Sequence, residues 1–311
     1  MSPVTPGVAV AKKMVSKKMV WGQVVSNVAA RLVAIGASDA DTQARRLVEE
    51  VSGFEGSEYF GVLAQSPTRQ QAARLEAMLA RCLAGEPLQY VLGRWSFRGL
   101  DLLVNNAVLI PRPETEILAG LVIAELVRRD SPGTLVVDLG TGSGAVGLAV
   151  AAECAMAQVV LTDVSVEALT VAQANLAGLG RAAGRVSVYQ GSWYEALPNS
   201  LAGKVDVVVS NPPYVRDDEV LPLNVADWEP TLALRGGMDG LDAARQILAE
   251  ATRWLSPRGQ VLLELAPSQM LAAAKLATAS DLVVEAVHKD LVGRERVLRC
   301  SRGTSCVLDK E

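Results

Sequence analysis

Residues 135–144 read Leu-Val-Val-Asp-Leu-Gly-Thr-Gly-Ser-Gly, and this stretch decides the fold. The apolar run that ends in Asp138 is typical of a buried parallel strand. Gly140, Gly142 and Gly144 come next, and glycines at alternate positions let a backbone turn tightly and lie against a ligand. The apolar residues that follow are typical of a helix. The stretch therefore predicts a strand, a ligand-binding turn and a helix.

Predicted strands and helices alternate from residue 134 onward. This alternation is typical of an α/β fold with a doubly wound sheet and helices on both faces. The last two strands lie close together in the chain, so we expect an antiparallel hairpin at one edge. The expected strands cover 135–138, 159–163, 186–189, 205–210, 260–265, 282–287 and 295–299, and the expected helices cover 144–152, 165–176 and 241–255.

The first third of the chain follows a different pattern. Apolar residues recur at helical spacing from about Trp21 to Gly85, and Asp41 and Thr68 are candidate helix caps. Alternating residues around Gly99 predict a β-hairpin. We therefore expect a small helical domain, with a substrate-docking or a structural role, that a hairpin joins to the sheet. The expected boundaries are 1–20 for a leader, 21–90 for the helical domain, 91–111 for the hairpin linker and 112–311 for the sheet domain.

The leader is basic, with four lysines and no acidic residue before Asp39. It lacks the apolar core and the small-residue cleavage site of a signal peptide. We expect it to be disordered, and a start of translation at Met14 or Met19 stays open.

Composition excludes several classes of function. The net charge is -4 and the pI is about 5.3, which argues against a dedicated nucleic-acid binder. The cysteines are scattered and His288 is the single histidine, so we expect no metal site and no histidine-based triad. No run of about 20 apolar residues occurs, so we expect no membrane span. A cytoplasmic enzyme with reduced thiols fits these observations.

Asn211, Pro212, Pro213 and Tyr214 follow the expected strand 205–210 directly. Ligands of open α/β sheets bind at the carboxyl ends of strands. Two prolines stiffen the loop and leave its carbonyls without a ladder partner, while the asparagine brings an amide and the tyrosine a flat ring. These groups suit a small planar group that carries an NH2. Taken alone, the four residues are equally consistent with an ordinary loop.

Two cofactor classes fit the glycine-rich turn. Asp138 would repel a phosphate but favours an amino group or hydroxyls, as in S-adenosylmethionine. Gly142, Gly144 and Gly147 also match the dinucleotide fingerprint, and Asp163 follows about 20 residues on. Asp163 can accept hydrogen bonds from ribose in either case. The loop at 211–214 favours the methyl donor, because a nicotinamide enzyme needs an acid or base there.

Together these stretches resemble the class I S-adenosylmethionine-dependent methyltransferases, and more specifically the release-factor glutamine N5-methyltransferases. The resemblance covers about residues 20 to 300. Asn-Pro-Pro-Tyr is shared with many nucleic-acid amino-methyltransferases, whereas the Ile-Pro-Arg-Pro-Glu-Thr-Glu stretch at 110–116, after a helical domain, is more specific. The stretches that carry it are 86–93, 110–116, 138–144, Asp163, 211–214, 229–234, 236–237, 240–242, 263–264, Gln269 and 290–294.

The resemblance implies a Rossmann-like sheet and methyl transfer from S-adenosylmethionine, which becomes S-adenosylhomocysteine. The acceptor would be the side-chain amide nitrogen, N5, of the glutamine in the Gly-Gly-Gln loop of class I peptide-chain release factors. No direct nucleic-acid or membrane partner is expected. Ser192 stands where the family often has an acid, and Glu295 replaces a commoner proline.

The resemblance also implies roles for individual residues. Asn211, Pro212 and Tyr214 would be catalytic. The substrate would be bound by Arg112, Asn211, Pro212, Pro213 and Tyr214. The cofactor would be bound by Asp138, Gly140, Thr141, Gly142, Ser143, Gly144, Asp163, Trp193 and Asn211, with Trp193 stacked on the adenine ring.

Our mechanistic hypothesis is that the loop holds the substrate amide without deprotonating it. The Asn211 side chain and the Pro212 carbonyl would accept the NH2 hydrogens, and Tyr214 would stack on the amide plane. Three other functions stay open. They are an amino-methyltransferase acting on a nucleic-acid base, which predicts a basic groove near Tyr214, a non-catalytic binding protein, and a nicotinamide oxidoreductase.

Overall fold

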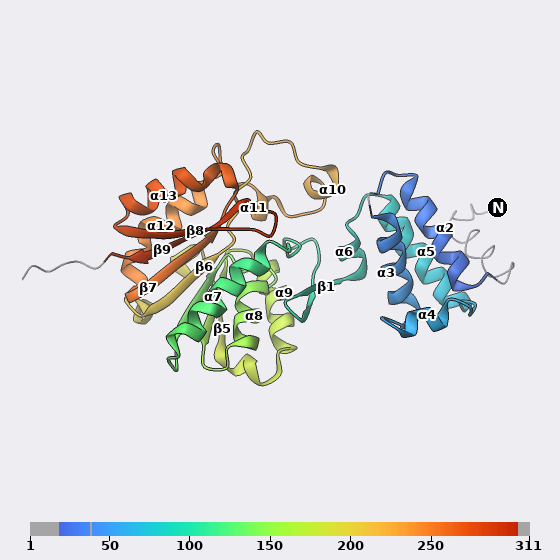
Figure 1. The fold of residues 1–311 in the computed structure, drawn as a ribbon, viewed down its shortest axis with the longest axis horizontal. Coiled ribbons are helices and arrows are strands. Elements are labelled where there is room, and N and C mark those ends of the chain that lie inside the picture. The colour runs from blue at the N-terminus through green and yellow to red at the C-terminus, as the bar shows by residue number, and fades with distance from the viewer. Residues whose placement is uncertain (1–18, 38, 304–311) are drawn as a thin grey trace, which may run out of the picture. The chain divides into compact units, whose positions relative to one another are not determined.

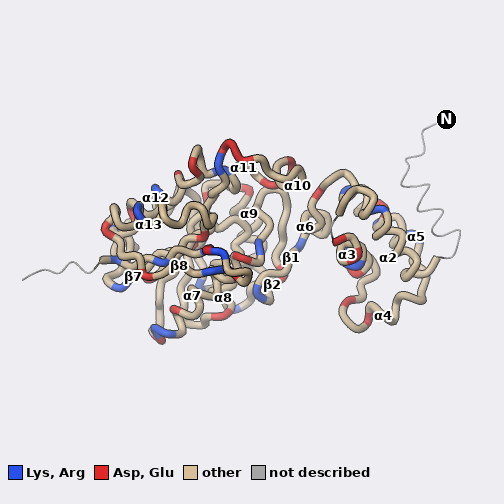
Figure 2. Tube along the Cα trace, turned by 45° about the horizontal axis from the view of Figure 1, so that its top comes forward, with Lys and Arg blue, Asp and Glu red and all other residues tan. Residues whose placement is uncertain are grey.

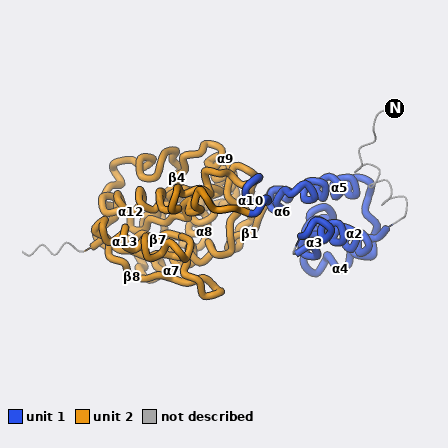
Figure 3. The backbone as a smooth tube through the Cα atoms, turned by 90° about the horizontal axis from the view of Figure 1, so that it is seen from above, with its two compact units in different colours: residues 1–93, 222–228 blue, residues 94–221, 229–311 orange. Residues whose placement is uncertain are grey.

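The computed structural model describes residues 19–37 and 39–303. The chain divides into two compact units (Figure 3). The helical unit comprises Met1–Gly93 with Pro222–Trp228, and the sheet unit comprises Arg94–Leu221 with Glu229–Glu311. The expected leader lies outside the described residues except for its last two positions. No helix in the described ranges has the length and apolar character needed to cross a membrane.

The helical unit packs its helices around a core that includes Trp21, Leu47 and Leu79. Thr68 caps α5 as predicted, because its Oγ1 accepts from the Gln71 backbone N–H at 3.2 Å. The predicted cap at Asp41 is wrong: the helix begins at Ala40, and Asp41 lies in its first turn. The helices are α2 (Trp21–Val33), α3 (Ala40–Ser52), α4 (Glu58–Val62), α5 (Arg69–Leu83), α6 (Leu88–Leu92) and, from the second segment, α10 (Leu223–Ala226).

The sheet unit begins with the predicted hairpin, which is shorter than the range 91–111. Strands β1 (Arg94–Phe97) and β2 (Leu100–Leu103) pair antiparallel around a turn at residues 98–99. Phe97 and Leu102 are buried against the sheet unit's own core, whereas Leu103 is exposed.

In the described part of the chain the main sheet has seven strands, in the order β5-β4-β3-β6-β7-β9-β8. The five strands β3 to β7 all run parallel, and β7 pairs antiparallel with β9. The expected terminal hairpin is present, with β9 inserted between β7 and the edge strand β8. The strands are β3 (Leu135–Leu139), β4 (Gln158–Asp163), β5 (Val186–Gln190), β6 (Val205–Ser210), β7 (Leu255–Glu264), β8 (Leu282–Lys289) and β9 (Glu295–Arg302).

Helices cover both faces of this sheet, which confirms the doubly wound architecture (Figure 1). Successive strand residues point to opposite faces, so Val136 packs with α7 and α8, whereas Val137 packs with α12 and α13. The helices are α7 (Thr115–Arg129), α8 (Ala145–Glu153), α9 (Val166–Ala177), α11 (Thr231–Leu234), α12 (Asp242–Trp254) and α13 (Met270–Ala279). The short 3-10 helices are η1 (Gly180–Arg185), η2 (Trp193–Ala196), η3 (Asn199–Leu201) and η4 (Pro267–Gln269).

The strand order reverses between β3 and β6. From β3 the chain builds outward through β4 and β5 and then returns to place β6 on the other side of β3. The Ser210 hydroxyl donates to the Leu139 carbonyl at 2.6 Å and holds the two carboxyl ends together. A ligand site is expected at such a reversal, because the loops after the two strands diverge there.

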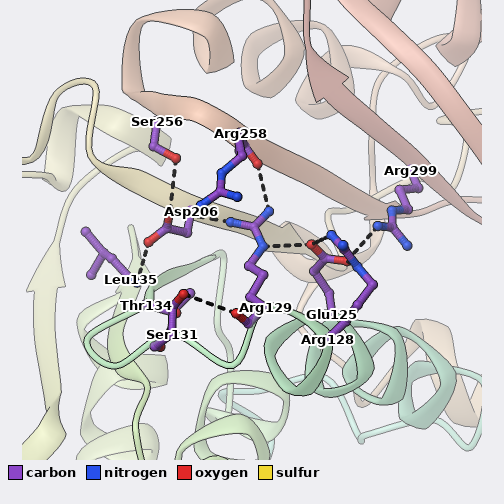
Figure 4. Close-up of polar contacts among 10 residues, drawn as sticks. All are labelled: Glu125, Arg128, Arg129, Ser131, Thr134, Leu135, Asp206, Ser256, Arg258 and Arg299. Atoms are coloured by element: carbon purple, nitrogen blue, oxygen red, sulfur yellow. Dashed lines mark hydrogen bonds and ion pairs between the residues drawn. The ribbon is translucent and has the colours of Figure 1, made fainter.

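A buried charge cluster joins the opposite, amino end of the sheet to the end of α7 (Figure 4). The Glu125 carboxylate contacts Arg128, Arg129 and Arg299 at 2.6 to 2.7 Å. Asp206 accepts from the backbone N–H of Leu135 and from the Ser256 hydroxyl, both at 3.0 Å. These contacts fix the helix against four strands without touching the carboxyl ends.

Candidate functional site

The glycine-rich turn after β3 is built as a close-approach loop. Gly140, Gly142 and Gly144 have φ of 69°, 56° and 85°, in the left-handed region that residues with a Cβ avoid. Gly147 has a different role, because a Cβ there would lie 2.2 Å from Leu161 Cδ2. Its missing side chain lets α8 pack directly on β4, so the position of the whole turn depends on it.

Asp138 is buried beneath this turn. Its Oδ2 accepts from the Thr141 hydroxyl at 2.6 Å and from the Gly147 backbone N–H at 3.0 Å. Burial raises the pKa of Asp138 to about 6, although these two hydrogen bonds lower it. At neutral pH the carboxyl group is therefore mostly ionised and adds negative charge to the site.

Asp163, at the end of β4, is hydrogen-bonded to the turn. One carboxylate oxygen accepts from the Gly142 backbone N–H at 2.9 Å, and the other accepts from the Ser165 backbone N–H at 3.0 Å. Each carboxylate oxygen still has a lone pair for a ligand hydroxyl. Two backbone donors, Gly142 in the turn and Gly147 in the first turn of α8, are thus already bound to carboxylates.

Trp193 forms a wall beside the turn. It begins η2, has a φ of 44° and is half-buried. A Cβ at Gly140 would lie 3.2 Å from its Cζ3, so glycine is the residue that lets the ring lie this close. The ring position is suited to stacking against a flat ligand group.

Asn211 lies at the carboxyl end of β6 with an unsatisfied acceptor. Its Nδ2 donates to Thr115 Oγ1 at 3.1 Å. Its Oδ1 is buried and has no hydrogen-bond partner among the described residues. A buried oxygen without a partner costs about 1–3 kcal/mol, so this atom is the strongest structural sign of a ligand that donates a hydrogen bond.

The rest of the Asn-Pro-Pro-Tyr loop is held by its backbone. Gln269 Nε2 donates to the Tyr214 carbonyl at 2.8 Å and to the Asp239 carbonyl at 3.1 Å. Gly240, with a φ of 73°, lies under the same carbonyl, and a Cβ there would approach it to 2.2 Å. The loop is therefore clamped between residues 239–240 and η4.

A cavity of about 440 Å³ joins these groups. Of the predicted site residues, nine line it. Gly144, Pro212, Tyr214 and Arg112 do not, and Tyr214 instead lines a separate cavity of about 330 Å³ with Gln269. The predicted residues that line the larger cavity are Asp138, Gly140, Thr141, Gly142, Ser143, Asp163, Trp193, Asn211 and Pro213.

Several lining residues were not predicted from the sequence. Leu232, Arg235, Asp242 and Gln246 come from the region 230–246. The motif stretches at 229–234 and 240–242 could have identified part of this wall, because they belong to the stretches that carry the family resemblance. Ser165 was predicted only as a helix start, and it lines the cavity as well.

Arg112 has a structural partner in the described chain. Its Nη2 contacts Glu229 Oε1 at 2.5 Å, and Glu229 Oε2 accepts from the Ile110 backbone N–H at 3.3 Å. The pair ties 110–112 to 229–230, and Pro111 and Pro230 from these segments line the cavity. A substrate-binding role of Arg112 stays a prediction.

The fold and this site define a methyltransferase. Two family models that match the chain agree with this class. The model described as "Methyltransferase small domain" matches residues 118–227. The model described as "PrmC N-terminal domain" matches residues 23–93. Between them they cover both the sheet unit's glycine-rich turn and most of the helical unit.

Curated relatives narrow the class to one family. The release factor glutamine methyltransferase of Agrobacterium fabrum is 38% identical over 88% of this chain and 94% of its own. The relatives of the same name from Cereibacter sphaeroides and Deinococcus radiodurans are 39% and 38% identical, over 86% and 88% of this chain and 93% and 95% of theirs. The chain belongs to the release factor glutamine methyltransferase family.

Proposed function

We propose that this enzyme transfers a methyl group from S-adenosylmethionine to the side-chain amide nitrogen of a glutamine in class I peptide-chain release factors. The glutamine is that of the Gly-Gly-Gln loop. The observation that carries the proposal is the buried Oδ1 of Asn211. It lies in the same cavity as the glycine-rich turn and has no donor among the described residues. Because release factors act in translation termination, we infer that the reaction takes place in the cytoplasm.

The cavity fits S-adenosylmethionine better than a dinucleotide. Asp138 and Asp163 place two carboxylates at the turn, where they would attract an amino group and hydroxyls and repel a diphosphate. The backbone donors of Gly142 and Gly147 are bound to these carboxylates and are not available to a phosphate. Asp138, Asp163, Trp193 and residues 140–144 would hold the cofactor, which supplies an electrophilic methyl group on a sulfonium.

The protein's contribution is to hold a weak nucleophile in place. An amide nitrogen has a delocalised lone pair, so orientation toward the methyl group is the main requirement. Asn211 Oδ1 accepts one N–H of the substrate amide. The Pro212 carbonyl, which accepts no hydrogen bond from the described residues, accepts the other.

The same two acceptors stabilise the positive charge that develops on the nitrogen. The methylated amide is strongly acidic and loses its proton to solvent or to a nearby acceptor. No histidine base is needed, in agreement with a sequence whose single histidine, His288, lies in β8.

A nucleic-acid base is a weaker candidate for the acceptor. That function predicts a basic groove near Tyr214, but residues 215–219 bring one arginine and three acidic residues. Charges of both signs are interspersed along the sheet unit (Figure 2). A protein acceptor is also consistent with the helical unit, for which we propose a role in docking the release factor.

The test is transfer of a labelled methyl group to purified release factor. We expect label on the wild-type factor and none on a factor whose Gly-Gly-Gln glutamine is changed to alanine. Asn211→Ala should lose transfer by about 100-fold or more, as removal of one positioned polar group does in other active sites, while the enzyme still binds S-adenosylmethionine. Label on the alanine factor, or normal turnover by Asn211→Ala, would contradict the proposal.

A further inference from the structure

A buried carboxylate lies behind Asn211, outside the wall of the cavity. Glu264 is the last residue of β7 and is 1% exposed. Ser210 and Leu263 are paired in register, so the residues that follow them, Asn211 and Glu264, lie at adjacent strand ends. The Oε2 of Glu264 has no hydrogen-bond partner among the described residues. The mechanism above gives this group no role.

Thr115 connects the two side chains. It is the first residue of α7 and is 4% exposed. Its Oγ1 accepts from Asn211 Nδ2 at 3.1 Å. Its hydroxyl also lies close enough to the Glu264 carboxylate to lower the pKa of that group, against the larger effect of burial, which raises it. Three segments far apart in the sequence thus meet at Thr115, which lies between the Glu264 carboxylate and the Asn211 amide with its unpartnered oxygen.

The chemistry of Glu264, Thr115 and Asn211 decides which group donates and which accepts. An ionised carboxylate can only accept, so the single hydroxyl proton of Thr115 is donated to Glu264. The Thr115 oxygen can then only accept from Asn211, which must turn its NH2 toward Thr115. Oδ1 is left facing away from Thr115, as observed. With the opposite orientation, Asn211 would present an NH2 to the NH2 of the substrate.

We propose that Thr115 and Glu264 are positioning residues that hold the Asn211 amide with its oxygen toward the substrate nitrogen. The proposal rests on the proposed function, because it assumes that the ligand of Asn211 donates a hydrogen bond. Neither residue donates to or accepts from the substrate amide itself.

Protonation of Glu264 allows the donor–acceptor direction through Thr115 to reverse. A neutral carboxyl is a donor as well as an acceptor, so it no longer fixes the direction of the Thr115 hydroxyl. When it donates to Thr115, the Thr115 proton becomes available to Asn211 Oδ1 and the amide can turn over. Burial raises the pKa of Glu264 to about 7, against the hydrogen bond from Thr115. Methyl transfer should therefore be high above this pKa and fall below it, in the physiological range.

The groups that face Glu264 come from four segments. The charge of Arg296, from β9, and that of Arg112 lower the pKa of Glu264, whereas Glu114, just before α7, raises it. Burial raises the pKa of Tyr214, and the charge of the nearby Glu264 raises it further. Arg296 is itself paired with Asp290 at 3.4 Å.

The first test compares two substitutions of Thr115. Thr115→Val keeps the shape but removes the hydroxyl, and we expect kcat to fall by about tenfold or more with little change in the KM for S-adenosylmethionine. Thr115→Ser keeps the hydroxyl and should restore most of kcat. Thr134→Val is the matched control, because Thr134 is similarly buried and bonds the Ser131 carbonyl at the far end of the sheet. Equal losses in all three variants would overturn the proposal.

The second test uses the pH dependence of methyl transfer. Glu264→Gln presents an amide oxygen that accepts the Thr115 proton but does not titrate. We expect the wild-type kcat to rise with an apparent pKa near 7 and the variant to keep most of its turnover without that step. A wild-type profile that is flat between about pH 6 and 8, or the same step in Glu264→Gln, would contradict the role of Glu264.

The third test does not depend on the substrate. In enzyme labelled with 15N-asparagine, the side-chain signal of Asn211 is identified by its absence from Asn211→Ala. We expect this signal to shift in Thr115→Val, and to titrate near pH 7 in the wild type but not in Glu264→Gln. An Asn211 signal that neither shifts nor titrates would contradict the positioning role but not the proposed function. Missing methylation of release factor by the wild type defeats the proposed function instead.

Discussion

The two carboxylates at the glycine-rich turn show how single side chains can serve both the fold and the ligand. Asp138 and Asp163 accept hydrogen bonds from the turn and from the start of the following helices. They thereby fix backbone positions and concentrate negative charge where a cationic ligand would bind. The cost is a buried charge, which is why the pKa of Asp138 is raised to about 6 by burial.

Asp138→Asn should separate these two roles. The asparagine oxygen can still accept from Thr141 and Gly147, so we expect the variant to fold. Loss of the charge should weaken S-adenosylmethionine binding by about tenfold or more, the size of one charge-assisted hydrogen bond, as titration calorimetry will measure. Unchanged affinity would remove Asp138 from the predicted cofactor site.

The same variant has a defined effect on the pH dependence of stability. The folded-state pKa of Asp138, about 6, lies above its reference value of 3.8. The folded protein therefore binds the proton more tightly, and this group's contribution to stability falls as pH rises from about 4 to 6. Urea unfolding at several pH values should show this decline in the wild type and a smaller one in Asp138→Asn.

At the level of the elements, the turn depends on how closely α8 packs on the sheet. Gly147→Ala would place a Cβ 2.2 Å from Leu161 Cδ2 and 3.1 Å from Asp138 Oδ2. We expect a loss of about 1–3 kcal/mol of unfolding free energy, because α8 must move away from β4. Gly184→Ala is the control, since no atom lies within 4 Å of a Cβ there and its φ is outside the left-handed region. Equal urea midpoints for the two variants would contradict the packing role.

The charge cluster at the end of α7 is a second element-scale feature. Burial disfavours the charge of Glu125, but hydrogen bonds from Arg128 and Arg129 and the charge of Arg299 outweigh it and lower the pKa of Glu125 to about 2. Because the folded-state pKa lies below the reference value of 4.5, the contribution to stability is complete above pH 4.5. It is lost as pH falls toward 2.

Glu125→Gln should therefore destabilise the sheet unit at pH 7. It removes the carboxylate that three arginines share, although Arg129 keeps its contact with Asp206 at 3.4 Å. Breaking a buried ion pair costs about 3–5 kcal/mol. Glu153→Gln removes a more exposed pair with Arg98 and should cost no more than about 1 kcal/mol. Chemical unfolding at pH 7 and pH 3 gives the comparison, and the difference between the two variants should shrink at the lower pH.

At the scale of the whole molecule, the two units have separate hydrophobic cores. The helical unit's cluster includes Leu79, and the sheet unit's clusters include Leu118, both without exposed surface. Units with their own cores can unfold in separate transitions. Only the sheet unit contains the cavity, so S-adenosylmethionine should stabilise that transition alone.

Leu79→Ala tests this independence. We expect a loss of about 2–5 kcal/mol in the transition of the helical unit, with cofactor affinity unchanged. Leu118→Ala should instead lower the transition that S-adenosylmethionine stabilises. Thermal unfolding with and without the cofactor distinguishes the two. A single transition that both variants lower equally would show that the units unfold together.

The sequence by itself determined the features that depend on neighbouring residues. Apolar runs predicted the strands, the residue type of Thr68 predicted its cap, and alternation predicted the hairpin around Gly99. The glycines at 140–144 predicted the turn. Periodicity and backbone preference act over a few residues, so they are readable in one sequence. Asp41 was misplaced because two acids, Asp39 and Asp41, flank the start of α3, and local pattern does not distinguish them.

Only the tertiary structure decided which distant residues meet. Glu264 and Thr115 each belonged to a stretch that carries the resemblance, 263–264 and 110–116, and nothing local links them to Asn211. The pairing of Arg112 with Glu229 and the absence of Tyr214 from the larger cavity are of the same kind. Such contacts follow from the strand order, in which β6 returns beside β3 and β9 inserts between β7 and β8. That order is set by the packing of the whole core, because the central strands β3 and β6 bury both of their faces whereas the edge strands β5 and β8 do not.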